Sequence, residues 1–354
     1  VKAAIVPRSN RLNPNQPFAA TTIAINIKGR EKIECLNITN SLKSFKSLII
    51  LFIIGILPKI SYNELMQTNY KELAIIGTTA SGKTSLAIEI AQKTNSIILS
   101  IDSLAVFKEI DIASAKPTPD ERENILHFGI DEIYPNEPFD VSHFLNLYKK
   151  AKQYAIDNSK NLIIVGGTGF YLKALVDGIS YLPPVSNETK KIVKQKLENI
   201  EEAYSFISTL DSIYMKNIAS NDKYRIEKAL SLYFTTNQIP SDYFNDNPKL
   251  PLAPNLPIFE IIWDRDILRQ RIEKRTKIMI NDGIINEVIY LEKKYTRTPP
   301  CMATIGISET LDYLDNKLSK EQLAEQITLN TARLAKSQRT FNNGQFENIN
   351  QFPL

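Results

Sequence analysis

The side chains with the most capacity for chemistry lie together in one stretch of eight residues. Gly77-Thr78-Thr79-Ala80-Ser81-Gly82-Lys83-Thr84 matches the pattern G-x-x-x-x-G-K-[ST]. Glycines at these positions let successive backbone N–H groups point at phosphate oxygens, and the start of a helix adds partial positive charge. Lys83 supplies a cation for the phosphates, and the Thr84 hydroxyl is a ligand for Mg²⁺. The pattern therefore predicts a loop that binds a polyphosphate together with Mg²⁺.

Two further polar side chains follow apolar runs of the sequence. Asp102 ends the run Ser96–Ile101, and its carboxylate there would act as a general base, hold Mg²⁺ through water, or cap a turn. Thr168 lies in Gly166-Gly167-Thr168-Gly169, where glycines let the backbone approach a ligand closely. The alternative for Thr168 is a tight turn with a capping threonine, which the spacing alone favours slightly.

Basic residues gather in two later segments. The first contains Arg265, Arg269, Arg271, Lys274, Arg275 and Lys277, and the second contains Arg333, Lys336 and Arg339. Arg271 and Arg275 are four residues apart and share one face of a helix. Such a face would clamp a diphosphate or follow a nucleic-acid backbone, although a solvated charged face is the commoner outcome.

Alternating strands and helices are expected to position these residues. The strands are predicted at Leu73–Ile76, Ser96–Ile101, Ile130–Ile133, Asn161–Val165 and Ile258–Trp263. The helices are predicted at Ser85–Lys93, Ser142–Asn158 with Ser142 as N-cap, Phe170–Asp177, Asp266–Asn281, Ile285–Lys294 and Lys320–Gln338. This alternation predicts an α/β fold, a P-loop NTPase-like parallel sheet with helices on both faces. Ligands of such sheets bind at the carboxyl ends of the strands, where the loop, Asp102 and Thr168 fall.

Proline-rich breaks divide the chain. Residues 185–257, after Pro183-Pro184, form a polar helical insertion; residues 66–184 and 258–354 form the catalytic core, which ends in a helical tail. Residues 1–65 show weak periodicity and carry nine basic and three acidic residues. We expect them to be a non-native or disordered leader, with Met66 as the natural start. The alternative is a membrane-associating leader, whose apolar run Leu48–Leu57 is about half the length of a membrane span.

Composition limits the class of protein. The 354 residues are 43% hydrophobic and carry a net charge of +4, but the chain after residue 65 has 34 basic and 36 acidic residues. The overall charge is therefore no argument for nucleic-acid binding. The 2 cysteines, Cys35 and Cys301, lie far apart without the spacing of a metal site, which fits a reducing compartment. We expect a cytoplasmic monomer without a membrane partner.

Four blocks of sequence together go beyond a generic phosphate loop. They are Gly77 to Thr84; Asp102-Ser103-Leu104-Ala105-Val106-Phe107 running on to Asp111 through Pro117; Gly166 through Tyr171; and Asn221-Asp222 through Arg225 to Leu230. In this order and spacing, the chain from about Met66 to Phe346 resembles the tRNA dimethylallyltransferase (isopentenyl-tRNA transferase) family.

The resemblance implies a reaction, its partners and its site. A dimethylallyl group would move from dimethylallyl diphosphate to the exocyclic amine of the adenosine just 3′ of the anticodon in the tRNA anticodon stem-loop. Residues 77–84 would hold the diphosphate with Thr84-bound Mg²⁺, and Arg275 would stabilise the leaving group. Asp102 would be the catalytic base. The residues implied to contact tRNA are Asp102, Ser103, Leu104, Ala105, Thr168 and Lys190, with the insertion gripping the anticodon stem.

The chain also departs from the family pattern. Ala105 stands where the family often has Gln, Phe107 where it has Tyr, and Ala113-Ser114 where it has Gly-Thr. The segment Ala303–Ser308 lacks the usual basic ends, which removes bonds expected to the adenosine and the tRNA backbone. Two other functions remain open at this point: a small P-loop kinase that uses ATP, and a P-loop RNA-binding protein without catalysis. The long insertion speaks against the first, and intact Lys83, Thr84 and Asp102 speak against the second.

Overall fold

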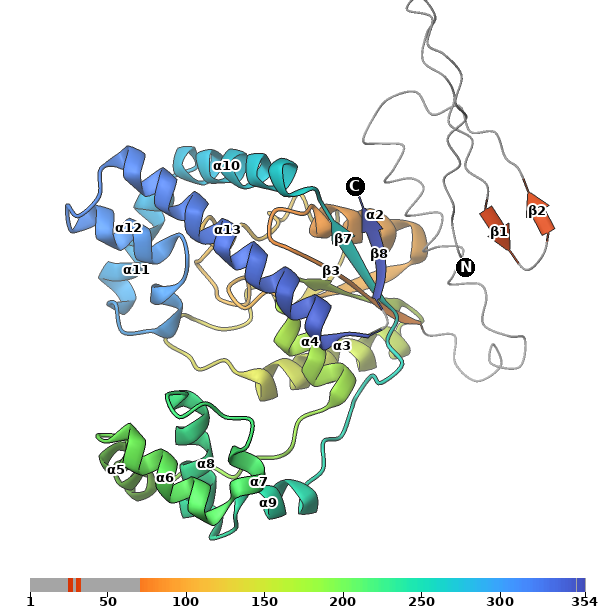
Figure 1. Ribbon diagram of the computed structural model, residues 1–354. Coiled ribbons are helices and arrows are strands. Elements are labelled where there is room, and N and C mark those ends of the chain that lie inside the picture. The colour runs from red at the N-terminus through yellow and green to blue at the C-terminus, as the bar shows by residue number, and fades with distance from the viewer. Residues whose placement is uncertain (1–24, 28–29, 33–70, 348, 354) are drawn as a thin grey trace, which may run out of the picture.

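The computed structural model describes residues 25–27, 30–32, 71–347 and 349–353 (Figure 1). The expected start at Met66 and the apolar run Leu48–Leu57 lie outside these residues. From the predicted leader the structure describes only β1 (Ile25–Ile27) and β2 (Arg30–Lys32), which pair antiparallel. Among the described residues no helix has both the length and the apolar character needed to cross a membrane.

A six-stranded sheet forms the centre of the larger lobe, and all its neighbouring strands are parallel. Its order is β5-β4-β6-β3-β7-β8. The strands are β3 (Glu72–Gly77), β4 (Ser96–Ser100), β5 (His127–Phe128), β6 (Asn161–Gly166), β7 (Ile258–Ile262) and β8 (Ile349–Pro353). The predicted parallel α/β sheet is thus confirmed.

Two details of the predicted strands are wrong. The strand beside β4 is His127–Phe128 and not Ile130–Ile133, of which Ile133 forms only an isolated bridge to Phe107. Gly129 explains the early end, because it has φ +77° and a Cβ there would lie 2.4 Å from the Ser100 carbonyl oxygen. The other difference is β8, which was not expected and pairs with β7 at the edge of the sheet.

Alternate residues of each strand enter two separate hydrophobic clusters. On one face Leu73 and Ile75 of β3 pack with the inner side of α2 (Lys83–Thr94). On the other face Ala74 and Ile76 join a larger cluster that includes α3 (Val141–Asp157), α4 (Gly169–Asp177) and the C-terminal helices. Both faces are therefore covered, as period-2 burial of parallel strands requires.

The N-cap of α3 differs from the prediction by two residues. Asp140 is the cap: its Oδ1 accepts hydrogen bonds from Ser142 N at 2.8 Å and His143 N at 3.0 Å. Ser142 itself lies in the first turn. A carboxylate at the N-cap satisfies two N–H groups and also suits the helix dipole, so Asp140 is favoured over a serine.

Five helices between the β6–α4 unit and β7 form a smaller lobe with its own apolar cluster. They are α5 (Asn187–Lys196), α6 (Ile200–Leu210), α7 (Ser212–Met215), α8 (Lys223–Thr236) and α9 (Pro240–Asp246). Ile207, Ile226 and Leu230 are fully buried in this cluster. The lobe lies apart from the sheet in Figure 1 and is joined to it by two connections. Tyr243 Oη of α9 donates to the Tyr181 carbonyl, in the first connection, at 3.0 Å.

The remaining helices follow β7 and pack beside the sheet. They are α10 (Arg265–Asn281), α11 (Ile284–Tyr295), a 3-10 turn (Pro300–Ala303), α12 (Ile307–Leu314) and α13 (Lys320–Gln345). Helix α13 continues seven residues beyond the expected end at Gln338 and lies alongside α10 (Figure 1). These two helices carry both basic segments of the sequence to the same side of the molecule.

Candidate active site

The phosphate loop connects β3 to α2, as the sequence predicts, and two glycines make its shape possible. Gly82 has φ +86°, in the left-handed region that favours glycine. A Cβ on Gly77 would lie 2.9 Å from Ser81 Oγ and 3.0 Å from the Ile261 carbonyl oxygen. The loop therefore fits tightly against β7, and α2 begins at Lys83 directly after the turn.

Three carbonyl oxygens of the loop are held by donors from other side chains. The pairs are Lys83 Nζ with Thr78 O at 3.4 Å, Arg271 Nε with Ala80 O at 2.8 Å, and Trp263 Nε1 with Ser81 O at 2.8 Å. Arg271 also lies 4.4 Å from the centre of the Trp263 ring, so these two donors support one another. With the carbonyls fixed in this way, the loop is preorganised before a ligand arrives.

Lys83 is buried with its charge inside the loop. Its side chain is 9% exposed, and burial lowers its pKa from 10.5 to about 8. The Asp102 carboxylate acts against this shift, and the Arg275 guanidinium adds to it. The Lys83 ammonium forms no ion pair with a carboxylate in the described part of the chain, and it is therefore suited to a multiply charged anion. The buried Ser81 Oγ also has no hydrogen-bond partner among the described residues.

Arg275 reaches the same place from α10. Its Nη1 donates to Thr79 Oγ1 and its Nη2 to the Ser114 carbonyl, both at 3.3 Å. Burial lowers its pKa, and the Asp102 carboxylate opposes that shift. Arg275 therefore joins the phosphate loop to the segment after Asp102, and the structure brings Lys83, Asp102 and Arg275 within electrostatic reach of one another.

Asp102 follows β4 by two residues and forms a turn. Its Oδ1 accepts hydrogen bonds from Leu104 N at 3.0 Å and Ala105 N at 3.3 Å. Its Oδ2 makes no hydrogen bond to another described residue. A Cβ on Gly166 would lie 3.2 Å from Asp102 N, so the Asp102 turn and the Gly166–Gly169 turn are in direct contact. One oxygen fixes the turn, and the other is left to take a proton.

Thr168 occupies the N-cap position of α4, but its side chain makes no capping hydrogen bond. The alternative of a tight turn with a capping threonine thus holds for the turn, in which Gly169 N donates to Gly167 O at 3.1 Å, and for the N-cap position, but not for a capping bond to the Thr168 hydroxyl. Its half-buried hydroxyl lies on the turn that contacts Asp102, where it can bond a ligand. Of the residues that follow Asp102 and are implied to contact tRNA, Ser103 is exposed and Leu104 half-buried, whereas Ala105 is only 3% exposed.

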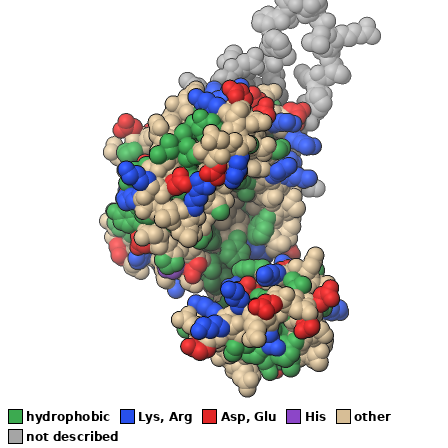
Figure 2. Space-filling model, turned by 90° about the vertical axis from the view of Figure 1, so that its left-hand side faces the viewer, with side chains coloured by type: hydrophobic (Ala, Val, Ile, Leu, Met, Phe, Trp, Pro, Cys, Tyr) green, Lys and Arg blue, Asp and Glu red, His purple; other side chains and the backbone are tan. Residues whose placement is uncertain are grey.

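Lys190 is not brought to this cluster. It is an exposed residue in the first turn of α5, on the smaller lobe. Figure 2 shows a hollow between this lobe and the larger one, with apolar side chains on its walls. A ligand that contacts both Lys190 and the Asp102 cluster must be large enough to reach both lobes.

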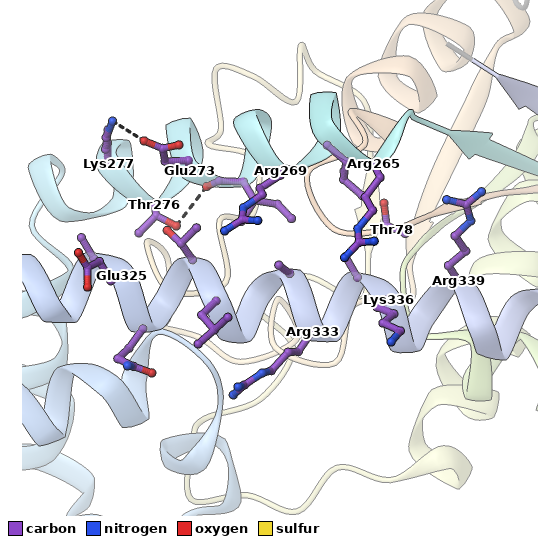
Figure 3. A pocket seen from close by; sticks show the side chains of 18 residues that line it. Thr78, Arg265, Arg269, Glu273, Thr276, Lys277, Glu325, Arg333, Lys336 and Arg339 are labelled. Atoms are coloured by element: carbon purple, nitrogen blue, oxygen red, sulfur yellow. Dashed lines mark hydrogen bonds and ion pairs between the residues drawn. The ribbon is translucent and has the colours of Figure 1, made fainter.

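A groove of about 900 Å³ runs between α10 and α13 and reaches the phosphate loop at Thr78 (Figure 3). Arg265, Lys336 and Arg339 surround the Thr78 end, and Arg269 and Arg333 lie further along. These five cations form no ion pair within the described part of the chain. The two acidic side chains, Glu273 and Glu325, lie at the far end, where Glu273 pairs with Lys277 at 2.7 Å. Positive charge thus increases toward the phosphate loop.

Two residues contact the phosphate loop although the sequence patterns do not indicate it. The sequence predicts Trp263 at the end of a strand and Gln338 at the end of a helix, and it indicates a role for neither. Trp263 follows β7 directly, at the edge of the sheet where the other site residues lie, which is the signal that would have found it. Gln338, whose Oε1 accepts a hydrogen bond from Thr79 N at 2.8 Å, is 259 residues away in sequence.

Known proteins share both the sequence and the fold. The sequence model of the family described as IPP transferase matches residues 105–345. A tRNA dimethylallyltransferase from Aliarcobacter butzleri is 61% identical over 278 residues, which cover 78% of this chain and 93% of that protein. The chain belongs to the IPP transferase family. A tRNA dimethylallyltransferase from Sulfurovum sp. is 53% identical over 80% of the chain and 95% of its own length.

Solved structures agree with this family assignment. A tRNA delta(2)-isopentenylpyrophosphate transferase from Staphylococcus epidermidis is 31% identical, with a TM-score of 0.55, over 80% of this chain and 93% of that one. A eukaryotic dimethylallyltransferase acting on tRNA has a TM-score of 0.70 over 80% of this chain and 74% of its own. At 24% identity, the latter shows the shared fold alone.

Proposed function

We propose that this protein transfers a dimethylallyl group from dimethylallyl diphosphate to N6 of the adenosine 3′-adjacent to the anticodon in tRNA. The observation that supports it most is the meeting of two cations, buried Lys83 and half-buried Arg275, with one carboxylate, Asp102, at the phosphate loop. An IPP transferase needs all three: cations for a departing diphosphate and a base for the attacking amine. Membership of that family makes this chemistry the first choice.

The cations act on the leaving group. As the allylic C–O bond breaks, its electron pair and the developing charge pass to the diphosphate. Lys83, Arg275 and the loop amides stabilise that charge, and they are already fixed in place. Binding of the diphosphate raises the pKa of Lys83 from about 8, so Lys83 is fully charged when the bond breaks.

The residues present suit a magnesium ion delivered with the diphosphate. The half-buried Thr84 hydroxyl makes no hydrogen bond to another described residue, and a hydroxyl plus phosphate oxygens is a donor set that Mg²⁺ accepts. Among the described residues no group of three His, Cys, Asp or Glu side chains could hold a metal without a ligand. Mg²⁺ held there would neutralise further charge on the diphosphate.

Asp102 accepts the proton of the amine. The N6 lone pair forms the new N–C bond with the allylic carbon, and the N6 proton passes to the Oδ2 of Asp102. Because an aromatic amine is a weak nucleophile, the base and the adenine must be held close together. We assign that positioning to the Thr168 hydroxyl, on the turn whose Gly166 contacts the Asp102 backbone, with the adenine turned out of the anticodon loop.

The tRNA occupies the hollow between the two lobes in this proposal. Exposed Ser103 and the neighbouring Leu104 lie on the larger lobe, and exposed Lys190 on the smaller, so an anticodon stem-loop contacts both. Ala105 contributes through its backbone, since its side chain is buried. We propose that one chain suffices and that it acts in the cytoplasm.

The groove between α10 and α13 serves the diphosphate in this proposal. Its cations increase in density toward Thr78, which draws a small anion to the loop. In Figure 1 α10 lies at the top of the view and the smaller lobe at the bottom, and in this proposal the diphosphate and the tRNA approach the site from these different directions.

The Asp102→Asn variant tests the assignment of the base. An asparagine Oδ1 still accepts from Leu104 N and Ala105 N, so the turn is kept. We expect tRNA binding within about threefold of wild type and a transfer rate lowered by at least about 100-fold. Transfer at the wild-type rate would refute Asp102 as the base, and ATP turnover without prenyl transfer would favour the kinase.

A further inference from the structure

Gln338 lies between the two turns that carry the donor and the acceptor groups. Its Oε1 accepts a hydrogen bond from Thr79 N, within the phosphate loop, at 2.8 Å. A Cβ on Gly167 would lie 2.5 Å from its Nε2 and 3.2 Å from its Cδ. The carboxamide therefore packs on the Gly167 backbone while it bonds the phosphate loop, so one side chain of α13 touches both turns.

The orientation of this carboxamide follows from its partner. Thr79 N–H can only donate, so the atom facing it is the oxygen, and the NH₂ group must face Gly167. Only a glycine leaves room for that group. The contact thus depends on two features at once: a side chain of this length on α13, and the missing Cβ of residue 167.

The two turns have different tasks in the proposed reaction. Residues 77–84 hold the diphosphate, and Gly166–Gly169 carries Thr168 and contacts the Asp102 turn. The distance between the allylic carbon and N6 is set by how these turns are spaced. A displacement of about 1 Å in such a site can cost about 100-fold in rate.

We propose that Gln338 is a positioning residue that fixes the spacing between the phosphate loop and the Thr168 turn. It does not touch the reacting atoms. Its loss therefore lowers kcat more than it weakens the binding of either substrate. This inference rests on the proposed function.

The test begins with Gln338→Met, which keeps the length and volume of the side chain without its hydrogen bond. We expect kcat to fall by at least about tenfold. The Kd of inorganic diphosphate, measured by calorimetry, should rise by no more than about threefold. The matched control is Gln345→Met, an exposed residue in the last turn of the same helix, which should leave kcat unchanged. Urea unfolding of each variant shows whether the fold is retained.

A double-mutant cycle then tests the contact with residue 167. Gly167→Ala pushes a Cβ into the Gln338 carboxamide, and Gln338→Ser removes that clash together with the bond to Thr79. If the two residues act through one contact, the double variant loses much less kcat than the product of the single losses. Multiplicative losses would overturn the proposal.

Two other outcomes also decide the matter. A folded Gln338→Met enzyme with kcat within about twofold of wild type overturns the inference, as does a variant whose whole loss is in diphosphate affinity. Wild-type turnover is measured first, because its absence refutes the proposed function itself, whereas normal wild-type turnover with an unaffected Gln338 variant refutes this inference alone.

Discussion

Replacing Lys83 by methionine should make the unliganded protein more stable at pH 7. Burial lowers the pKa of Lys83 from 10.5 to about 8, so the charged side chain opposes folding. At about 1.4 kcal/mol per pH unit, this difference corresponds to about 3 kcal/mol. Loss of the long hydrogen bond from Lys83 Nζ to Thr78 O, at 3.4 Å, reduces the expected gain in unfolding free energy by about 1 kcal/mol. We therefore expect a net gain of about 2 kcal/mol.

The stability difference between Lys83→Met and wild type should decrease as the pH rises. Because the pKa is lower in the folded than in the unfolded state, the penalty is complete below about pH 8 and disappears as the pH rises toward 10.5. The stability difference between Lys83→Met and wild type should thus shrink to near zero by about pH 10. Urea unfolding of both proteins at pH 7 and pH 10 measures this difference.

A matched control is available on the same helix. Lys93 is 46% exposed and pairs with Glu89 at 3.0 Å, so Lys93→Met should change stability by less than about 0.5 kcal/mol at either pH. A Lys83→Met protein no more stable than wild type at pH 7, or equally stabilised at both pH values, would refute the argument. The same variant should lose diphosphate binding, which links the cost in stability to the function.

Two further substitutions test the support of the phosphate loop and the groove. Trp263→Phe removes the donor to Ser81 O and should weaken diphosphate binding by about fivefold in calorimetry, and unchanged affinity would show that the loop holds its shape without it. Arg269→Glu combined with Lys336→Glu should lower kcat/KM for the donor by at least about tenfold at low salt, with the loss smaller at high salt. Lys274→Glu, on α10 but outside the groove lining, is its control, and a loss confined to tRNA affinity would assign the groove to RNA instead.

The central part of the fold could be predicted because its signals are local. Strands β3, β4, β6 and β7 are short, mostly apolar runs, which the sequence alone identifies as buried strands. The edge strand β8 was missed because Ile349-Asn350-Gln351-Phe352-Pro353 mixes polar and apolar residues and ends in proline. Its strand form depends on pairing with β7, and an edge position is where a sheet tolerates proline.

Some residues of the candidate site could likewise be predicted from the sequence, and others could not. Lys83, Asp102 and Thr168 each follow a predicted strand, and the carboxyl ends of parallel strands meet at one edge, so their proximity followed from the fold class. Arg275 could be selected only as a member of a basic helix face. Trp263 and Gln338 bond backbone atoms 182 and 259 residues away, and no spacing in the sequence reports such a contact. Thr168 was ambiguous because a capping threonine and a ligand-binding one have the same sequence context.

The most direct test of the account is the product that the wild-type protein makes. Purified protein is incubated with dimethylallyl diphosphate, Mg²⁺ and unmodified tRNA. The tRNA is then digested for mass spectrometry, one portion to nucleosides and another to oligonucleotides that locate the modified base. The account predicts an adenosine that carries one dimethylallyl group on N6, located next to the anticodon, and none with Lys83→Met. Folded wild-type protein that binds both substrates and yields only unmodified adenosine would contradict it.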